Sequence, residues 1–194
     1  MRELRLWLVR HGQSTANAGA PASDPLQTPL TSLGLEQARA AALQVGVAPD
    51  LLVASPMRRA AQTADALHAR WPETSRETWP ISEFTYLSPP RCIGTTGPQR
   101  SEWVSDYWDR CLPEHVDGEG AESFAAFMSR VRDFHDRATA RGGFIVAVGH
   151  GQFFRAYAWA RSLAFAATPE TMREFRRREV ADPMRNGEIV KIPS

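Results

Sequence analysis

Lysine is almost absent from this sequence, and so is any excess of charge. Lys191 is the only lysine among the 23 basic side chains, which are otherwise arginine, and 22 acidic side chains leave a formal net charge of +1. A chain this close to neutral lacks the one-signed field that attracts nucleic acid or an anionic membrane surface. We therefore expect neither nucleic acid nor a membrane as a partner.

Cysteines and long apolar runs are also scarce. Cys92 and Cys111 have no CxxC spacing and no nearby histidine at the spacing of a metal site, so we expect free thiols and no metal. No run approaches the roughly 18 apolar residues of a membrane span, and residues 1–5 carry mixed charge, unlike a signal peptide. The sequence thus predicts a cytoplasmic protein.

What remains is the composition of an ordinary folded domain. Hydrophobic residues make up 43% of the 194 residues and charged residues 23%, which argues against a disordered or low-complexity chain. A chain of this length can bury a core without disulfide or metal staples. We expect a single domain over residues 1–194.

Alternating strand and helix patterns predict an α/β architecture. Short apolar runs predict strands at residues 4–9, 51–54, 78–81 and 144–148, with a last strand at 188–192 after the turn Asn186-Gly187. Helical patterns lie at residues 32–45, 56–70 and 122–138. Alternation of this kind is typical of βαβ units around a largely parallel sheet.

Residues 84–120 break this alternation. They combine several prolines and glycines with Tyr86, Trp103, Tyr107 and Trp108, too irregular for a sheet element and too aromatic for a linker. We expect an irregular insertion over one end of the sheet, placed to cover a substrate.

Two His-Gly pairs follow predicted strands. Arg10-His11-Gly12 comes after residues 4–9, and Gly149-His150-Gly151 comes after residues 144–148. Ligands of open parallel sheets bind outside the carboxyl ends of the strands, so both histidines are expected to face one pocket.

A third element brings an arginine toward the same edge. Ser is a favoured helix cap and Pro a favoured first helical residue, so Ser55-Pro56 predicts a helix start with Arg59 in its first turn. A helix N-terminus attracts anions, and a guanidinium there can bind two oxygens of a phosphate. An isolated arginine in such a place is more often a surface ion-pair partner.

Together, these motifs resemble the histidine phosphatase superfamily, also called phosphoglycerate mutase-like. The matching blocks run in the family's order: residues 8–14 with Asn17; Leu30-Thr31 with Gly34 and Gln37-Ala38; Ser55-Pro56 with Arg59-Ala60 and Gln62-Thr63-Ala64; Glu122-Ser123; and Gly149-His150-Gly151. The resemblance implies a three-layer α/β/α sandwich with a mostly parallel central sheet. It also implies cofactor-free, metal-independent phosphoryl transfer through a phosphohistidine.

By this resemblance, His11 is the nucleophile, while Arg10, Asn17, Arg59 and His150 surround the phosphoryl oxygens. Elementary chemistry agrees with that assignment. Phosphoryl transfer depends on positioning and on neutralising oxygen charge, which arginines can supply. Nearby arginines also disfavour protonation of His11, which must be neutral to attack.

A leaving alkoxide needs a proton, and Glu83 is the candidate acid. It follows the predicted third strand, where the family's acid usually stands, although an exposed glutamate at a strand end would look the same. Candidate substrate contacts are Gln13, Tyr86, Arg91 and Gln152.

The sequence favours a phosphatase over a mutase. Ala16 stands where the family's mutases usually carry an aromatic residue, and residues 84–120 lack the Tyr, Lys and paired Arg pattern that mutases use. We expect a phosphomonoesterase acting on a small phosphorylated metabolite. A mutase, a protein phosphatase and a non-catalytic phosphate-binding regulator are the alternatives.

Overall fold

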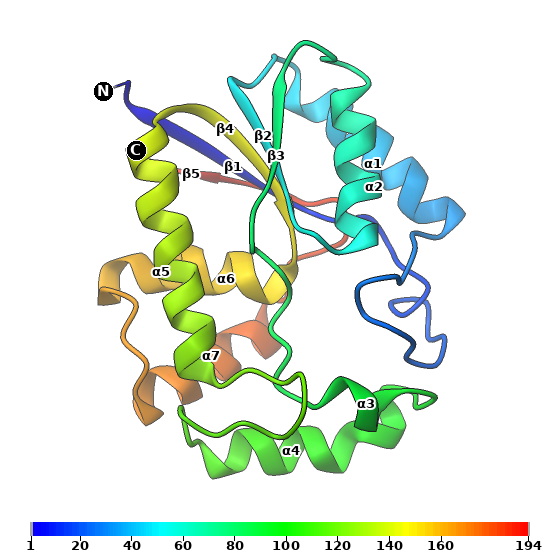
Figure 1. The fold of residues 1–194 in the computed structure, drawn as a ribbon, viewed down its shortest axis with the longest axis vertical. Coiled ribbons are helices and arrows are strands. Elements are labelled where there is room, and N and C mark those ends of the chain that lie inside the picture. The colour runs from blue at the N-terminus through cyan, green and yellow to red at the C-terminus, as the bar shows by residue number, and fades with distance from the viewer. Residues whose placement is uncertain (1, 194) are drawn as a thin grey trace.

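The computed structural model describes residues 2–193, which form a five-stranded sheet flanked by helices (Figure 1). In spatial order the strands are β3 (Ser75–Thr78), β2 (Leu51–Ala54), β4 (Gly143–Gly149), β1 (Leu4–Arg10) and β5 (Ile189–Ile192). Neighbouring strands are parallel except β5, which runs antiparallel to β1. The predicted mixed α/β fold with a mostly parallel sheet is confirmed.

The pleat of the sheet divides the core between its two faces. In β1, Leu6 and Leu8 pack on one face, whereas Trp7 and Val9 pack on the other. Helices α1 (Ser32–Val45) and α2 (Arg58–His68) cover the Trp7 side, and α5 (Phe124–Arg141), α6 (Gly151–Ala160) and α7 (Pro169–Ala181) lie on the Leu6 side. β1 and β4 are therefore buried from both faces.

The long helices begin at capping residues that can be recognised in the sequence. Thr31 accepts a hydrogen bond from Gly34 N at the start of α1, and Ser123 accepts one from Ala126 N at the start of α5. Thr168 forms a capping box ahead of Pro169 in α7. None of the described helices is both long and apolar enough to span a membrane.

The expected strand at residues 78–81 is wrong, because the strand occupies Ser75–Thr78 instead. Ile81 N donates back to Trp79 O at 2.8 Å, so the chain turns at Pro80 instead of continuing along β2. The carbonyls of Pro80 and Ser82 accept hydrogen bonds from Arg130. Trp79 and Ile81 are nevertheless buried in the core, which is why the segment has the apolar pattern of a strand.

The second correction concerns the start of α2. The helix begins at Arg58, with Met57 in the capping position, and not at Ser55-Pro56. Ser55 Oγ accepts a hydrogen bond from Met57 N and lies 2.8 Å from His150 Nε2, so this side chain contacts the second histidine instead of capping the helix. Arg59 still falls in the first turn of the helix, as the sequence predicted.

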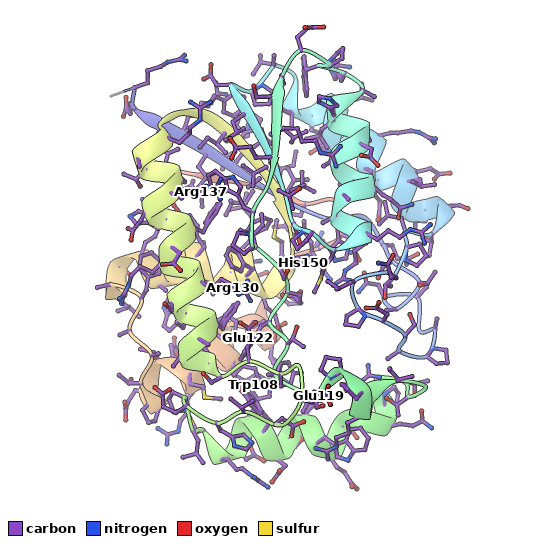
Figure 2. The ribbon with its side chains drawn as sticks, viewed as in Figure 1. Trp108, Glu119, Glu122, Arg130, Arg137 and His150 are labelled. Carbon is purple, nitrogen blue, oxygen red and sulfur yellow. The ribbon has the colours of Figure 1, made fainter. Side chains whose placement is uncertain are left out.

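Residues 84–120 are more regular than expected. They contain α3 (Pro89–Cys92), the 3-10 turn η1 (Pro98–Arg100) and a ten-residue helix, α4 (Ser101–Arg110). Tyr107 and Trp108 of α4 are buried against Phe84, which stacks on Phe127 of α5. Figure 1 shows α3 and α4 side by side at one end of the molecule, and Figure 2 labels Trp108 there. A second 3-10 turn, η2 (Arg161–Leu163), follows α6.

A close approach of two backbones fixes the loop after β1. A Cβ on Gly12 would lie 2.1 Å from Gly34 O, and a Cβ on Gly34 would lie 2.1 Å from Gln13 O. Real side chains do not tolerate such distances, so the loop and the first turn of α1 can meet only through glycine.

We therefore expect Gly34→Ala to lower the free energy of unfolding by about 1–3 kcal/mol, because the backbones must separate to admit the methyl group. Gly97→Ala is the matched control, since a Cβ there meets nothing within 4 Å and its φ is −52°. Urea unfolding followed by circular dichroism measures both. Equal stability of the two variants would show that the contact yields easily.

Candidate active site

The two predicted histidines meet at the carboxyl edge of the sheet. Arg10 of β1 pairs with Gly149 of β4, and His11 N donates a hydrogen bond to Gly149 O at 2.9 Å. The imidazole rings of His11 and His150 lie 5.1 Å apart, centroid to centroid, and both are almost fully buried. The two histidines thus face each other at this edge of the sheet, as the sequence predicted.

Hydrogen bonds define which nitrogen of His11 is reactive. Nδ1 lies 2.6 Å from Gly12 O, and because a carbonyl only accepts, Nδ1 must carry the proton. The lone pair of Nε2 then accepts a hydrogen bond from Arg59 Nε at 3.1 Å. Burial, together with the charges of Arg59 and Arg10, lowers the pKa of His11 from 6.5 to about 3, so the ring is neutral.

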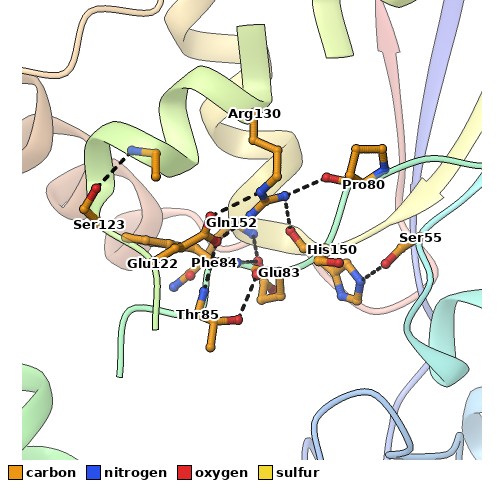
Figure 3. Close-up of polar contacts among 12 residues, drawn as sticks. Ser55, Pro80, Glu83, Phe84, Thr85, Glu122, Ser123, Arg130, His150 and Gln152 are labelled. Atoms are coloured by element: carbon orange, nitrogen blue, oxygen red, sulfur yellow. Dashed lines mark hydrogen bonds and ion pairs between the residues drawn. The ribbon is translucent and has the colours of Figure 1, made fainter. Parts of the chain in front are cut away.

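His150 has the opposite tautomer. Its Nδ1 lies 3.4 Å from Arg59 Nη2, which can only donate, so Nε2 carries the proton and donates to Ser55 Oγ at 2.8 Å (Figure 3). Burial is the main reason that the pKa of His150 is held well below its ordinary value, and the charge of Arg59 adds to it. Sequence reasoning missed this role of Ser55 because Ser-Pro also has the form of a helix start.

Arg59 joins the two histidines from the first turn of α2. Its Nη1 donates to Pro25 O at 2.7 Å, while Nε and Nη2 face the imidazole rings. Burial lowers the pKa of Arg59, opposed by the nearby charge of Glu83. The guanidinium is thus a fixed, mostly desolvated cation beside His11.

Arg10 approaches the pocket from the end of β1. Its Nη1 donates to Met184 O, in the connection between α7 and β5. Within the described chain its buried Nε has no hydrogen-bond partner. A Cβ on Gly151 would lie 3.3 Å from that nitrogen, so Arg10 runs past the N-terminus of α6.

Glu83 lines two cavities in the structure. Its Oε1 accepts hydrogen bonds from Gln152 N, in the first turn of α6, at 3.1 Å and from Phe84 N at 3.3 Å (Figure 3). Burial raises the pKa of this carboxyl above its ordinary value, although Arg59 and Arg10 oppose the shift. A buried carboxyl with a raised pKa is suited to donate a proton.

The side chain of Asn17 is oriented by three donors. Its Oδ1 accepts from Ser14 N at 3.1 Å, from Ser14 Oγ at 3.0 Å and from Asn186 Nδ2 at 3.2 Å. With Oδ1 occupied, the amide nitrogen is the group available to an incoming anion. Asn186 also donates to His11 O, a contact that the Asn-Gly turn signal did not reveal.

The predicted substrate contacts divide into two groups. Tyr86 lines both cavities beside Glu83, and Gln152 lines the second. Gln13 and Arg91 are held elsewhere, because Gln13 Oε1 accepts from Thr31 Oγ1 at 2.9 Å and Arg91 pairs with Asp117 at 3.1 Å.

The first cavity has a volume of about 240 Å³ and is mostly apolar in character. Its lining includes Met57, Arg59, Glu83, Tyr86, Leu87 and Arg100. Arg100, at the end of η1, is a cation that sequence reasoning missed, because nothing in the sequence distinguishes it from the other arginines of the insertion. Across residues 2–193 no cluster of three or more His, Cys, Asp or Glu side chains is arranged to hold a metal ion.

The sequence that forms this fold matches an established protein family. Residues 6–182 match the model of the histidine phosphatase superfamily (branch 1), so the chain belongs to that family. The matched stretch contains β2, β3, β4, most of β1, the helices that flank the sheet and the blocks predicted from the sequence, and it ends before β5.

Curated relatives include two kinds of phosphatase. The chain is 34% identical over 142 residues to the adenosylcobalamin/alpha-ribazole phosphatase of Escherichia coli, covering 68% of this chain and 64% of the relative. It is 48% identical over 71 residues to the glucosyl-3-phosphoglycerate phosphatase of Mycolicibacterium vanbaalenii, covering 36% of this chain and 32% of the relative. The matches thus span less than two thirds of either relative's length.

Among solved structures, a mycobacterial glucosyl-3-phosphoglycerate phosphatase in complex with VO3 superposes with a TM-score of 0.73. The two sequences are 27% identical, and the alignment covers 97% of this chain and 92% of the other. The fold is therefore shared over nearly the whole length of both proteins.

The lowered pKa of His11 predicts loss of stability in acid. The unfolded imidazole binds a proton as the pH falls through 6.5, whereas the folded one does so only near 3, so protons favour the unfolded state between these values. His11 is expected to contribute ~2 kcal/mol to the stability lost between pH 7 and pH 5.

Urea unfolding of wild type and His11→Gln at both pH values measures this contribution. The wild type should lose more stability than the variant on acidification. Identical losses would mean that the folded protein accepts the proton on His11 without strain.

Proposed function

We propose that the protein is a metal-independent phosphomonoesterase that hydrolyses a small phosphorylated metabolite through a phosphohistidine on His11. The observation that carries this proposal is the buried, neutral imidazole, with Nδ1–H bonded to Gly12 O and the Nε2 lone pair beside Arg59. The relatives that share the fold are named as phosphatases, which supports the reaction class. We place the reaction in the cytoplasm, in keeping with the free thiols Cys92 and Cys111.

The phosphoryl group is bound by Arg10, Asn17, Arg59 and His150. Arg59 first exchanges its hydrogen bond to His11 Nε2 for phosphoryl oxygens, which frees the lone pair. The unpartnered Nε of Arg10 and the amide nitrogen of Asn17 supply further donors. Two guanidinium groups neutralise the oxygens, which is the main requirement of phosphoryl transfer.

In the first step, His11 Nε2 attacks phosphorus. The Nε2–P bond forms while the ester P–O bond breaks, and the leaving alkoxide takes the proton of the Glu83 carboxyl. The ring becomes cationic, and its Nδ1–H bond to Gly12 O stabilises that charge.

In the second step, water attacks the phosphohistidine. The water gives a proton to the Glu83 carboxylate, the Nε2–P bond breaks, and inorganic phosphate leaves. Glu83 is protonated again and His11 is neutral, so the enzyme returns to its starting state.

Residues 84–120 belong to the same domain as the sheet in this proposal and cover the substrate. Tyr107 and Trp108 join the core cluster that contains Leu6 and Phe127, so the insertion is anchored to the sheet layer. The body of the substrate occupies the 240 Å³ cavity, where Tyr86 offers an aromatic wall and Arg100 a cation.

The first test is phosphate release from an aryl phosphate in excess EDTA. We expect wild type to be active and His11→Ala to lose at least ~10³-fold, because the nucleophile is gone. His135→Ala is the matched control, since this histidine contacts Tyr157 and not the pocket.

Trapping with labelled substrate separates the alternatives. A label that is lost in acid and kept in alkali supports the phosphohistidine. Labelling without phosphate release would indicate a mutase, and binding without labelling a regulator. Either result would overturn the proposed hydrolysis.

The second test compares two arginines of the insertion. Arg100 lines the cavity, whereas Arg91 pairs with Asp117, so Arg100→Ala should raise the KM for a substrate with a second anionic group about tenfold. Arg91→Ala should change it less than about twofold. A small aryl phosphate is the reference substrate, and the reverse order of effects would return Arg91 to the site.

A further inference from the structure

The segment that carries Glu83 has no regular secondary structure to hold it. Residues 80–86 belong to neither a strand nor a helix, although a proton donor must stay within about half an ångström of its working position. The side chain of Arg130 in α5 and that of Glu122, just before α5, bind the backbone of this segment instead (Figure 3).

Arg130 of α5 binds the backbone on the N-terminal side of Glu83. Its Nη1 donates to Pro80 O and to Ser82 O, each at 2.9 Å. Both carbonyls lie beyond the end of β3 at Thr78, outside the ladder that joins β3 to β2. Arg130 thus binds a stretch of backbone that the sheet does not hold.

Glu122 binds the backbone on the C-terminal side. Its Oε1 accepts from Thr85 N at 3.3 Å, and Glu122 N donates to Thr85 O at 2.9 Å. Arg130 and Glu122 also pair with each other through two hydrogen bonds, Nη2 to Oε1 at 2.5 Å and Nε to Oε2 at 3.2 Å. One ion pair therefore holds both sides of Glu83.

The pair is mostly removed from solvent. The side chain of Arg130 is 18% exposed and that of Glu122 is 22% exposed, and the guanidinium lies 5.2 Å from the ring of Phe153. Removing one partner would leave a charge in a poorly solvated place, as well as free carbonyls. The planar fork of arginine makes four directed hydrogen bonds here, which the point charge of lysine cannot reproduce.

We propose that Arg130 and Glu122 are positioning residues for proton transfer by Glu83. They act on the backbone of residues 80–85, and neither side chain lines the two cavities that Glu83 lines. The inference rests on the proposed function, in which Glu83 protonates the leaving group. Its consequence is selective: attack by His11 does not depend on this pair, whereas protonation of the leaving group does.

The test compares kcat/KM for an alkyl phosphate and for p-nitrophenyl phosphate, whose leaving group needs no proton. For each substrate, kcat/KM reports only the steps up to release of the alcohol or phenol, so it does not depend on the later hydrolysis of the phosphohistidine. Arg130→Met should lower the value for the alkyl substrate roughly 10- to 100-fold and that for the aryl substrate less than about threefold. Arg130→Lys should recover only part of the alkyl activity.

Arg137→Met is the matched control. Arg137 lies two turns further along α5, pairs with Glu77 at 2.8 Å and stacks on Trp79 (Figure 2). The Arg137→Met variant should leave the ratio of alkyl to aryl activity unchanged. Glu122→Gln keeps the shape of the second partner, and we expect the same selective loss, smaller in size.

A double variant decides whether the pair acts through Glu83. In Arg130→Met with Glu83→Gln, the alkyl loss should equal that of Glu83→Gln alone. Additive losses, or equal losses on both substrates, would overturn the positioning role. If Glu83→Gln itself shows no leaving-group dependence, the acid assignment fails; if wild type shows no His11-dependent activity, the proposed function fails.

Discussion

The neutral imidazole of His11, held beside the buried guanidinium of Arg59, is the constraint on which this structure depends. Arg59 lies 3.1 Å from His11 Nε2, and such a pair is stable only if the ring stays unprotonated. The carbonyl of Gly12 fixes the proton on the other nitrogen, and the close approach of Gly12 to Gly34 fixes that loop in place. Burying Arg59 and His150 costs free energy, and burial of the apolar side chains on both faces of β1 and β4 offsets that cost.

The sequence predicted the place of a residue correctly wherever its neighbours along the chain determine that place. His-Gly at the ends of two apolar runs predicted the position of both histidines, because parallel strands deliver their carboxyl ends to one edge. Arg59 was predicted from the helix start, even though the helix begins later than Ser55-Pro56 indicated. These residues needed only local signals.

Contacts between distant segments were missed for the opposite reason. Asn186 bonds to Asn17, and Arg130 bonds to Pro80 and Ser82, but each has the ordinary sequence context of a turn or a helix face. Helix α4 was missed because prolines and glycines on both sides outweighed its own pattern, in which Trp103, Val104, Tyr107 and Trp108 share a face. Tertiary packing decides which structure such a local pattern adopts, and a single sequence does not show that packing.

The position of β1 in the sheet has a consequence for how the protein is made. Leu4 pairs with Gly143, and Leu6 pairs with Ile192, so β1 is synthesised long before both of its partner strands. Contacts so distant in sequence form slowly, and until then an apolar strand stays exposed on the nascent chain. The site around His11 therefore assembles late, after translation has passed Asn186, whose side chain donates to His11 O.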